Sequence, residues 1–85
     1  MLKPEHLRWA RHLLGWTVRD LSNASLVGET TIRRFEIHGE QLRERTLLNL
    51  KEALERAGIE FTEGKPGPTS IRCEDGMTLT LVRKP

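Results

Sequence analysis

The sequence predicts a small, mainly α-helical domain that ends in a β-hairpin. Hydrophobic residues recur at three- and four-residue intervals in the segments before Gly58. Hydrophobic and polar residues alternate on both sides of Asp75-Gly76. The chain has 85 residues, which supply one modest core rather than two. We therefore expect a bundle of four to five helices over residues 1–58 and a short β tail, a possible dimerisation element, over residues 59–85.

The first predicted helix begins at Pro4 and stops at Gly15. Proline suits a first turn because its φ is already helical and its missing N–H is not needed there. Its hydrophobic face consists of Leu7, Ala10, Leu13 and Leu14. The second helix is short, with Thr17 as N-cap and Asp20 completing a capping box. Its inward-facing residues are Val18, Leu21 and Ser25.

The third predicted helix runs from about Glu29 to Ile37. Its buried positions are Ile32 and Phe35. The fourth runs from about Glu44 to Ala57 and stops at Gly58, because glycine commonly follows the end of a helix. Its hydrophobic stripe consists of Leu47, Leu50, Leu54 and Ala57.

The segment after the fourth helix has a different pattern. "GKPGP" at 64–68 is predicted to be a loop because it combines two glycines with two prolines. Alternating hydrophobic residues on either side of "EDG" predict a hairpin that turns at Asp75-Gly76, and "IEF" at 59–61 is a candidate third strand. An isolated hairpin is only marginally stable in water. We therefore expect it to pack on the helices or to pair with another chain.

Composition places the chain among ordinary globular proteins, with 36% hydrophobic and 31% charged residues. No hydrophobic run approaches the roughly 20 residues that cross a bilayer, and the first residues do not resemble a signal peptide. The single cysteine, Cys73, cannot form an internal disulfide. These features predict a cytoplasmic protein that does not associate with membranes. Residues 1–34 carry six Lys/Arg and three acidic residues, a balance compatible with a polyanionic partner.

Residues 17–36 combine the three features that a helix-turn-helix requires. A small residue, Ser22, stands where the two helices cross. Hydrophobic residues that set the crossing angle follow at intervals of six, five and three, and they are Leu21, Val27, Ile32 and Phe35. Polar or charged residues remain on the outer side of the second of the two helices, and they are Glu29, Thr30, Arg33 and Arg34.

On these residues the chain resembles the phage-repressor and Cro-type (Xre-like) helix-turn-helix family. The likeness runs from "LRWARHLLGWTVRDLS" through "LVGETTIRRFE" to "RTLLNLKEALERAGIEF". It implies a lambda-repressor-like bundle that binds double-stranded DNA, usually as a homodimer, and an ion pair between Arg11 and Glu36. The DNA-binding positions that it implies are Thr17, Gly28, Glu29, Thr30, Arg33, Arg34, Arg43 and Arg45.

The chain departs from the family pattern at three positions. Leu26 stands where the turn usually has glycine, so either it adopts a left-handed conformation at a cost of about 1 kcal/mol or the turn relaxes. Gly28 replaces the usual Ser/Thr N-cap, which costs about a few tenths of a kcal/mol. Val18 replaces a glutamine that grips a phosphate, which removes one positioning contact. None of these changes abolishes the helix-turn-helix shape.

Each candidate site residue also has a purely structural interpretation. Arg33 and Arg34 are either DNA contacts or a solvated helix face, and Arg34 is the better candidate for a bidentate contact with guanine, worth about 1–3 kcal/mol. Glu29 either accepts from a cytosine amino group or stabilises the N-terminus of its own helix, and the second is favoured. Thr30 either touches a thymine methyl group or is a surface residue.

The remaining distinctive residues are assigned to structure. Trp16 is expected to pack in the core, whereas Trp9 lies off the main stripe and is expected to be partly exposed. The three histidines show no metal-ligand spacing with Cys73 or with each other, so no metal site is expected. Cys73 is interpreted as a small buried hydrophobic residue. Because the chain has no phosphate-binding glycine loop and no clustered catalytic set, neither an enzyme nor a cofactor is expected.

The functional hypothesis is a bacterial or phage transcription regulator whose helix near Glu29 enters the major groove of DNA. Because a single small helix-turn-helix makes few phosphate contacts, we expect a homodimer that reads two half-sites about 34 Å apart. Its contact surface is either the β tail from Met77 to Val82, which an unpaired strand edge favours, or the exposed side of the fourth helix near Leu48. The alternative is an antitoxin-like, antirepressor or antiactivator module that keeps the fold and binds a protein.

Overall fold

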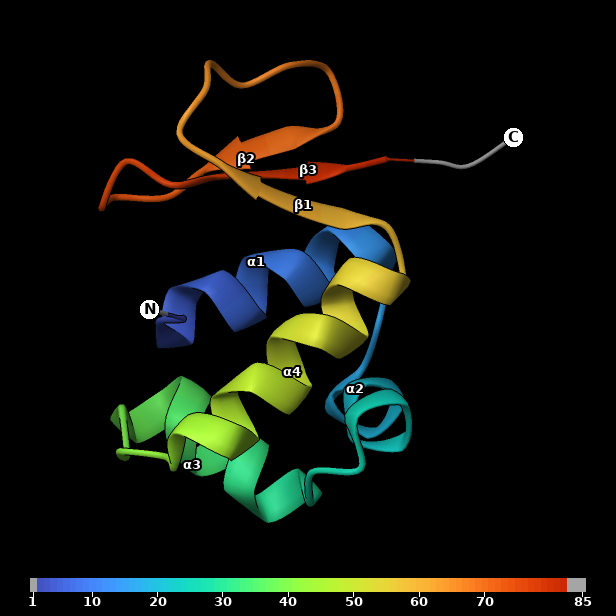
Figure 1. Cartoon of the computed structure of the whole chain (residues 1–85), viewed down its shortest axis with the longest axis vertical. Coiled ribbons are helices and arrows are strands. Elements are labelled where there is room, and N and C mark those ends of the chain that lie inside the picture. The colour runs from blue at the N-terminus through green and yellow to red at the C-terminus, as the bar shows by residue number, and fades with distance from the viewer. Residues whose placement is uncertain (1, 83–85) are drawn as a thin grey trace.

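The computed structural model describes residues 2–82, and within them the chain forms four helices and one three-stranded antiparallel sheet (Figure 1). The helices are α1 (Pro4–Leu14), α2 (Val18–Ser25), α3 (Glu29–His38) and α4 (Glu44–Arg56). The strands are β1 (Ile59–Thr62), β2 (Ser70–Arg72) and β3 (Thr78–Leu81). The four helices, the hairpin and the third strand are thereby confirmed, while residues 83–85 of the predicted tail lie outside the described residues. None of these helices has the length and hydrophobicity that a membrane crossing requires.

The ends of the first two helices follow local signals in the sequence. Pro4 occupies the first turn of α1, and Gly15 ends that helix in the left-handed region at φ 70°. The capping box of α2 is also confirmed. The Thr17 N–H donates to Asp20 Oδ2 at 2.9 Å, and the Asp20 N–H donates to Thr17 Oγ1 at 3.1 Å. These four residues set boundaries of α1 and α2 through local contacts and backbone conformation.

The sheet has the strand order β1-β3-β2, and the prediction of a free strand edge at residues 77–82 is wrong. β3 is the central strand, with Leu79 paired to Phe61 on one side and to Ile71 on the other. The "IEF" segment causes this, because it joins the hairpin along the side that a two-stranded tail would leave open. The two sheet edges therefore belong to β1 and β2.

The strands share one hydrophobic core with the helices. Ile59, Cys73 and Leu79 are buried together with Leu7 of α1 and Leu50 of α4. The hairpin is therefore stabilised by packing on the helices, which is one of the two outcomes expected from its marginal stability alone.

Gly58 makes the tight passage from α4 into β1 possible. Its φ is 111°, a value that L side chains rarely adopt, and its carbonyl accepts from the Val82 N–H at 2.7 Å. A Cβ atom at this position would lie 2.6 Å from the Val82 carbonyl oxygen. Only glycine therefore lets the chain turn back along β3.

The sheet and α3 lie at opposite ends of the molecule. Its longest dimension is 32 Å, and along this axis the sheet lies at one end while α2 and α3 lie toward the other (Figure 1). α1 and the C-terminal part of α4 lie directly beneath the sheet (Figure 1). This arrangement leaves the outer surface of α3 uncovered by the C-terminal strands.

Candidate nucleic-acid interface

The hydrophobic residues that were predicted to brace the helix-turn-helix are all buried. Leu21 and Ile32 are completely inaccessible, and Val27 and Phe35 are also in the core. Because they come from α2, the following turn and α3, they hold the two helices at one angle. The bracing predicted from the intervals in the sequence is confirmed.

The turn between α2 and α3 is tight and does not relax at Leu26. This residue adopts φ 63° and ψ 22°, and its side chain is 91% exposed. Ser25 supports the turn from within, since its Oγ donates to the Leu21 carbonyl at 2.7 Å and accepts from the Val27 N–H at 3.2 Å. The sequence predicted that Ser25 faces inward, but it did not predict these two hydrogen bonds, because they depend on the path of the backbone through the turn.

Replacing Leu26 with glycine is expected to stabilise the protein by up to about 1 kcal/mol, because glycine adopts the left-handed region without strain. Leu26→Ala is the matched control. It removes the same exposed side chain but keeps a Cβ, so it should leave the free energy of unfolding within about 0.5 kcal/mol of wild type. Urea denaturation measures both values, and equal stabilities for the two variants would contradict strain at this turn.

An ion pair between the partly buried Arg11 and the buried Glu36 connects α1 to α3. The guanidinium of Arg11 donates to both carboxylate oxygens of Glu36, at 2.8 Å through Nε and 2.6 Å through Nη2. Arg11 Nη1 also donates to the Trp16 carbonyl at 3.1 Å. The hydrogen bond and charge of Glu36 raise the pKa of Arg11 above its ordinary value, against the opposing effect of burial. The pairing that the family resemblance implied is confirmed, and it holds α3 at a defined angle to α1.

Arg8 contributes a second contact between these helices. Its Nη1 donates to the backbone carbonyl of Glu36. The sequence pattern does not indicate this role of Arg8, because an exposed arginine one turn before Arg11 carries no signal of its partner. Two arginines of α1 thus converge on one residue near the end of α3.

The outer face of α3 carries the exposed groups that the sequence predicted. Thr30, Arg33 and Arg34 are exposed, and Gly28 is the N-cap with φ −61° and ψ 146°. Glu29 lies in the first turn, where a carboxylate stabilises the positive end of the helix. Its Oε1 also accepts from Arg33 Nη2 at 3.1 Å. An exposed pair with this spacing is worth about 0.3–0.5 kcal/mol, so Arg33 is easily released.

Arg34 differs from Arg33 in its partners. Among residues 2–82 no carboxylate forms an ion pair with Arg34, and its side chain is exposed. The guanidinium therefore needs to break no ion pair before it meets an external anion or base. Of the two neighbouring arginines, Arg34 is the one available without rearrangement.

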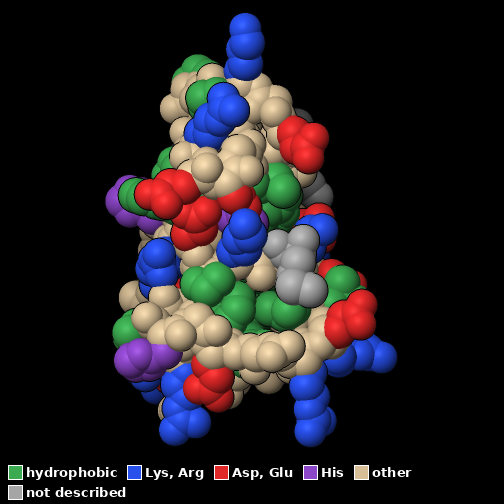
Figure 2. Space-filling view, turned by 90° about the vertical axis from the view of Figure 1, so that its left-hand side faces the viewer, with side chains coloured by type: hydrophobic (Ala, Val, Ile, Leu, Met, Phe, Trp, Pro, Cys, Tyr) green, Lys and Arg blue, Asp and Glu red, His purple; other side chains and the backbone are tan. Residues whose placement is uncertain are grey.

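The remaining predicted site residues lie at the starts of α2 and α4. Thr17 is exposed, and its Oγ1 already caps α2, which leaves the hydroxyl proton available to donate. Arg43 is the N-cap residue of α4, and Arg45 lies in its first turn, both exposed. Figure 2 shows Lys and Arg side chains projecting from the lower end of the molecule, the end at which α3 lies.

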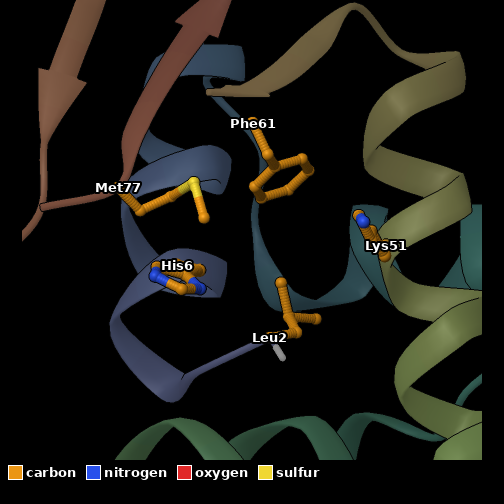
Figure 3. A pocket seen from close by; sticks show the side chains of 5 residues that line it. All are labelled: Leu2, His6, Lys51, Phe61 and Met77. Atoms are coloured by element: carbon orange, nitrogen blue, oxygen red, sulfur yellow. The ribbon is translucent and has the colours of Figure 1, made fainter. Parts of the chain in front are cut away.

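One small cavity lies between the sheet and the helices. A cavity of about 100 Å³ lies beneath the sheet and is lined by Leu2, His6, Lys51, Phe61 and Met77 (Figure 3). Phe61 and Met77 enter it from the sheet side, and Lys51 enters from α4 with its Nζ 5.8 Å from the centre of the Phe61 ring (Figure 3). This volume is below the range of about 300–1,000 Å³ typical of small-molecule sites.

The fold brings together four potential metal ligands that the sequence spacing did not group. One ligand atom each from Glu5, His6, Cys73 and Asp75 lies within 4.8 Å of the others. Residues 5–6 and 73–75 are far apart in the chain, and only the packing of the hairpin on α1 joins them.

Within this cluster, hydrogen bonds join His6 to Asp75 and to the backbone of Lys3. The Lys3 N–H donates to His6 Nδ1 at 3.0 Å, so the proton of the neutral ring lies on Nε2, which donates to Asp75 Oδ2 at 3.0 Å. In a metal-bound histidine, the ring nitrogen that does not bind the metal usually donates a hydrogen bond. In His6 this nitrogen, Nδ1, accepts one instead. The N–H of Met77, which donates to Asp75 Oδ1, lowers the pKa of Asp75. Burial opposes this effect, and His6 and Lys3 lower the pKa further. The cluster thus fastens the start of α1 to the β2–β3 turn.

Cys73 is expected to react slowly with iodoacetamide in the folded protein. Burial, together with the carboxylates of Glu5 and Asp75, raises its pKa from an ordinary 9.0 to about 11, and the residue is 4% exposed. Because the thiolate is the reactive species, the native rate at neutral pH should be at least about 100-fold below that of the urea-unfolded chain. Mass spectrometry of timed samples measures both rates, and similar rates would contradict the placement of this thiol in the core.

A scan against protein-family models finds no match for this chain, and a search of curated proteins finds no similar sequence. The interpretation of the interface therefore depends on its geometry and charge.

Proposed function

We propose that the protein is an Xre-like transcription regulator with a lambda-repressor-like bundle, which binds double-stranded DNA by inserting α3 into the major groove. The observation that carries this proposal is the two-sided character of α3. Its inner face is anchored by Ile32 and Phe35 in the core, while Arg33 and Arg34 are exposed on the outside. The sheet lies at the opposite end of the molecule, so it does not obstruct a duplex at α3 (Figure 1).

In this proposal the exposed residues divide into two groups. Arg34 reads a guanine through two parallel hydrogen bonds, and Arg33 joins it after leaving Glu29. Thr17, Arg43 and Arg45 contact phosphates on either side, which orients the helix without reading sequence. Val18 has no polar group that could contact a phosphate, so the affinity for DNA depends more on the exposed arginines.

Selection of duplexes from a randomised library with the purified protein tests the proposal. The selected site is labelled with fluorescein, and its affinity is measured by anisotropy over a range of salt concentrations. We expect the logarithm of the binding constant to fall linearly with the logarithm of salt concentration, with a slope of about −0.9 per neutralised phosphate. Failure to enrich any sequence, or an affinity that resists rising salt, would exclude the proposed mechanism.

A second candidate function is the binding of a protein, as in an antitoxin-like or antiactivator module. The exposed side chains of Leu26 and Ile37, 91% and 70% accessible, favour it, because they offer hydrophobic contact area at the two ends of α3. Heparin chromatography separates the two functions. Elution at low salt, together with a stable complex with the product of a neighbouring gene, would favour protein binding.

A further inference from the structure

The packing of the hairpin on α1 brings a thiol, an imidazole and two carboxylates together. They belong to Glu5 and His6 in the first turn of α1 and to Cys73 and Asp75 in the β2–β3 turn, and we call these four residues the α1–hairpin cluster. One possible ligand atom from each lies within 4.8 Å of the others. The ligand atoms around a tetrahedral zinc ion are roughly 3.5 Å apart, so small side-chain rotations bring all four within reach of one ion.

The backbone of the β2–β3 turn fixes the positions of Cys73 and Asp75 relative to one another. The Cys73 N–H donates to the Met77 carbonyl at 2.7 Å, and the Cys73 carbonyl accepts from the Gly76 N–H at 3.0 Å. The Met77 N–H donates to Asp75 Oδ1 at 3.1 Å, while Asp75 Oδ2 faces His6 Nε2. Metal-binding carboxylates are typically oriented by a hydrogen bond of this kind to the oxygen that does not face the ion.

The carboxylate of Glu5 is a second observation that points to a cation. It is half-buried beside the thiol of Cys73, and within residues 2–82 no cationic side chain forms an ion pair with it. A thiolate at Cys73 would face two carboxylates, and a divalent ion between them removes this repulsion. Three anionic ligands around Zn²⁺ leave a net charge of −1, which the ammonium of Lys3, 3.4 Å from Asp75 Oδ2, neutralises.

The chemistry of these four groups selects the metal. Zn²⁺ binds thiolate sulfur and imidazole nitrogen well, whereas Mg²⁺ and Ca²⁺ prefer oxygen ligands. His6 and Cys73 are 2% and 4% exposed, but the side chain of Asp75 is 20% exposed, so an ion can enter from the carboxylate side. Four protein ligands complete a tetrahedral zinc ion and leave no position for a reacting water, which is typical of a structural site.

Zinc binding requires a proton to move on the ring of His6. That proton lies on Nε2, which faces Asp75, while Nδ1 accepts from the Lys3 N–H. When zinc occupies Nε2, the proton passes to Nδ1, and the Lys3 N–H turns to water, which is accessible because Lys3 is exposed. The thiol of Cys73 releases its own proton to solvent, because the thiolate is the form that binds metal. One proton thus leaves the protein for each zinc ion bound.

We propose that the α1–hairpin cluster binds one Zn²⁺ ion through Glu5, His6, Cys73 and Asp75, and that this ion fastens the β2–β3 turn to α1. The convergence of a buried thiol, a buried imidazole and an unpaired carboxylate from two distant segments carries the proposal. His6 lies beneath the sheet, next to Met77 (Figure 3). Because α3 lies toward the opposite end of the molecule, the zinc site does not depend on the proposed function (Figure 1).

Titration with Co²⁺ tests the ligands directly, because Co²⁺ occupies zinc sites and has an absorption spectrum that reports its ligands. The protein is first treated with EDTA and desalted. We expect one Co²⁺ ion per chain, a sulfur-to-cobalt charge-transfer band in the near ultraviolet and the intense visible bands of tetrahedral coordination. Added Zn²⁺ should abolish both sets of bands. Weak visible absorption without a charge-transfer band would overturn the proposal.

Glu5→Gln distinguishes this site from zinc bound elsewhere on the surface. The variant keeps the shape of the side chain and breaks no ion pair, so it should fold like wild type while its zinc affinity falls by about tenfold or more. Glu52→Gln is the matched control, because it removes an exposed carboxylate from the side of α4 nearest α2, and it should bind zinc like wild type. Competition with a chromophoric chelator measures the affinities. Unchanged affinity in both Glu5→Gln and Cys73→Ser would assign the zinc to exposed histidines, His12 and His38, and overturn the proposal.

Nitrogen NMR of the imidazole rings tests the movement of the proton on His6. After EDTA treatment we expect the proton on Nε2, and saturation with Zn²⁺ should transfer it to Nδ1. The rings of His12 and His38 should not change. If His6 kept its Nε2 proton in saturating zinc, it would not be a ligand, and the site of four ligands would be wrong.

Discussion

Replacing Arg34 with alanine is expected to lower the affinity for the selected DNA site by about 1–3 kcal/mol for each half-site, the worth of one good bidentate base contact. The expectation follows from the position of Arg34, which is exposed on α3 and has no ion-pair partner within the described residues. The variant should also lose its preference at one base pair of each half-site. Anisotropy titrations against the selected duplex and against versions changed at single positions measure both effects.

Two controls separate base reading from simple charge. Arg72→Ala removes the same charge from an exposed position on β2, at the end of the molecule far from α3, and should leave sequence preference unchanged (Figure 1). Arg34→Lys keeps the charge but loses the planar fork of donors, so it should retain salt-dependent affinity and lose discrimination. If Arg34→Ala bound the selected site as tightly as Arg72→Ala, the assignment of Arg34 as the reading residue would be wrong.

The parts of this fold that were predictable depend on residues close together in sequence. The capping box of Thr17 and Asp20 closes over three residues, and the glycines after α1 and α3 end those helices through their own backbone conformation. The four bracing residues of the helix-turn-helix lie within one short segment, at intervals of six, five and three. Because these signals are local, the pattern alone locates the helices and the exposed face of α3.

The parts that were not predictable depend on contacts across the chain. The central position of β3 requires β1 to join the hairpin. Nothing in the residues of "IEF" indicates which edge of the hairpin they will join. The hydrogen bond between His6 and Asp75 joins residues 69 positions apart. The hollows along α4 are lined by separate segments of the chain, so Leu2 and Leu42 carry no indication in the sequence that they lie near Leu48. Each of these features arises only once the packing order of the elements is known.

The link between α1 and α3 leads to the largest expected loss of stability. Glu36 is 5% exposed, and its carboxylate receives two hydrogen bonds from Arg11. Arg11→Met would leave this carboxylate buried without a partner, which destabilises a protein by about 3–5 kcal/mol. Small domains have only about 5–15 kcal/mol in total, so the variant should unfold at a much lower urea concentration. Urea denaturation followed by circular dichroism measures the change in midpoint, and an unchanged slope would show that the extent of unfolding is the same.

Three further variants separate the contribution of the ion pair to stability from the general effect of losing one arginine. Arg19→Met makes the same change on the exposed surface of α2 and should alter stability by less than about 0.5 kcal/mol. Glu36→Gln keeps the shape of the side chain but removes its charge, so it should lower the stability less than Arg11→Met does. This variant can be measured if Arg11→Met does not fold. Replacing both partners, by Arg11→Met with Glu36→Leu, removes the unpaired buried charge and should recover most of the lost stability. If Arg11→Met were no less stable than Arg19→Met, the pair would contribute no more than a surface ion pair, and the angle of α3 would have to be set by its hydrophobic contacts alone.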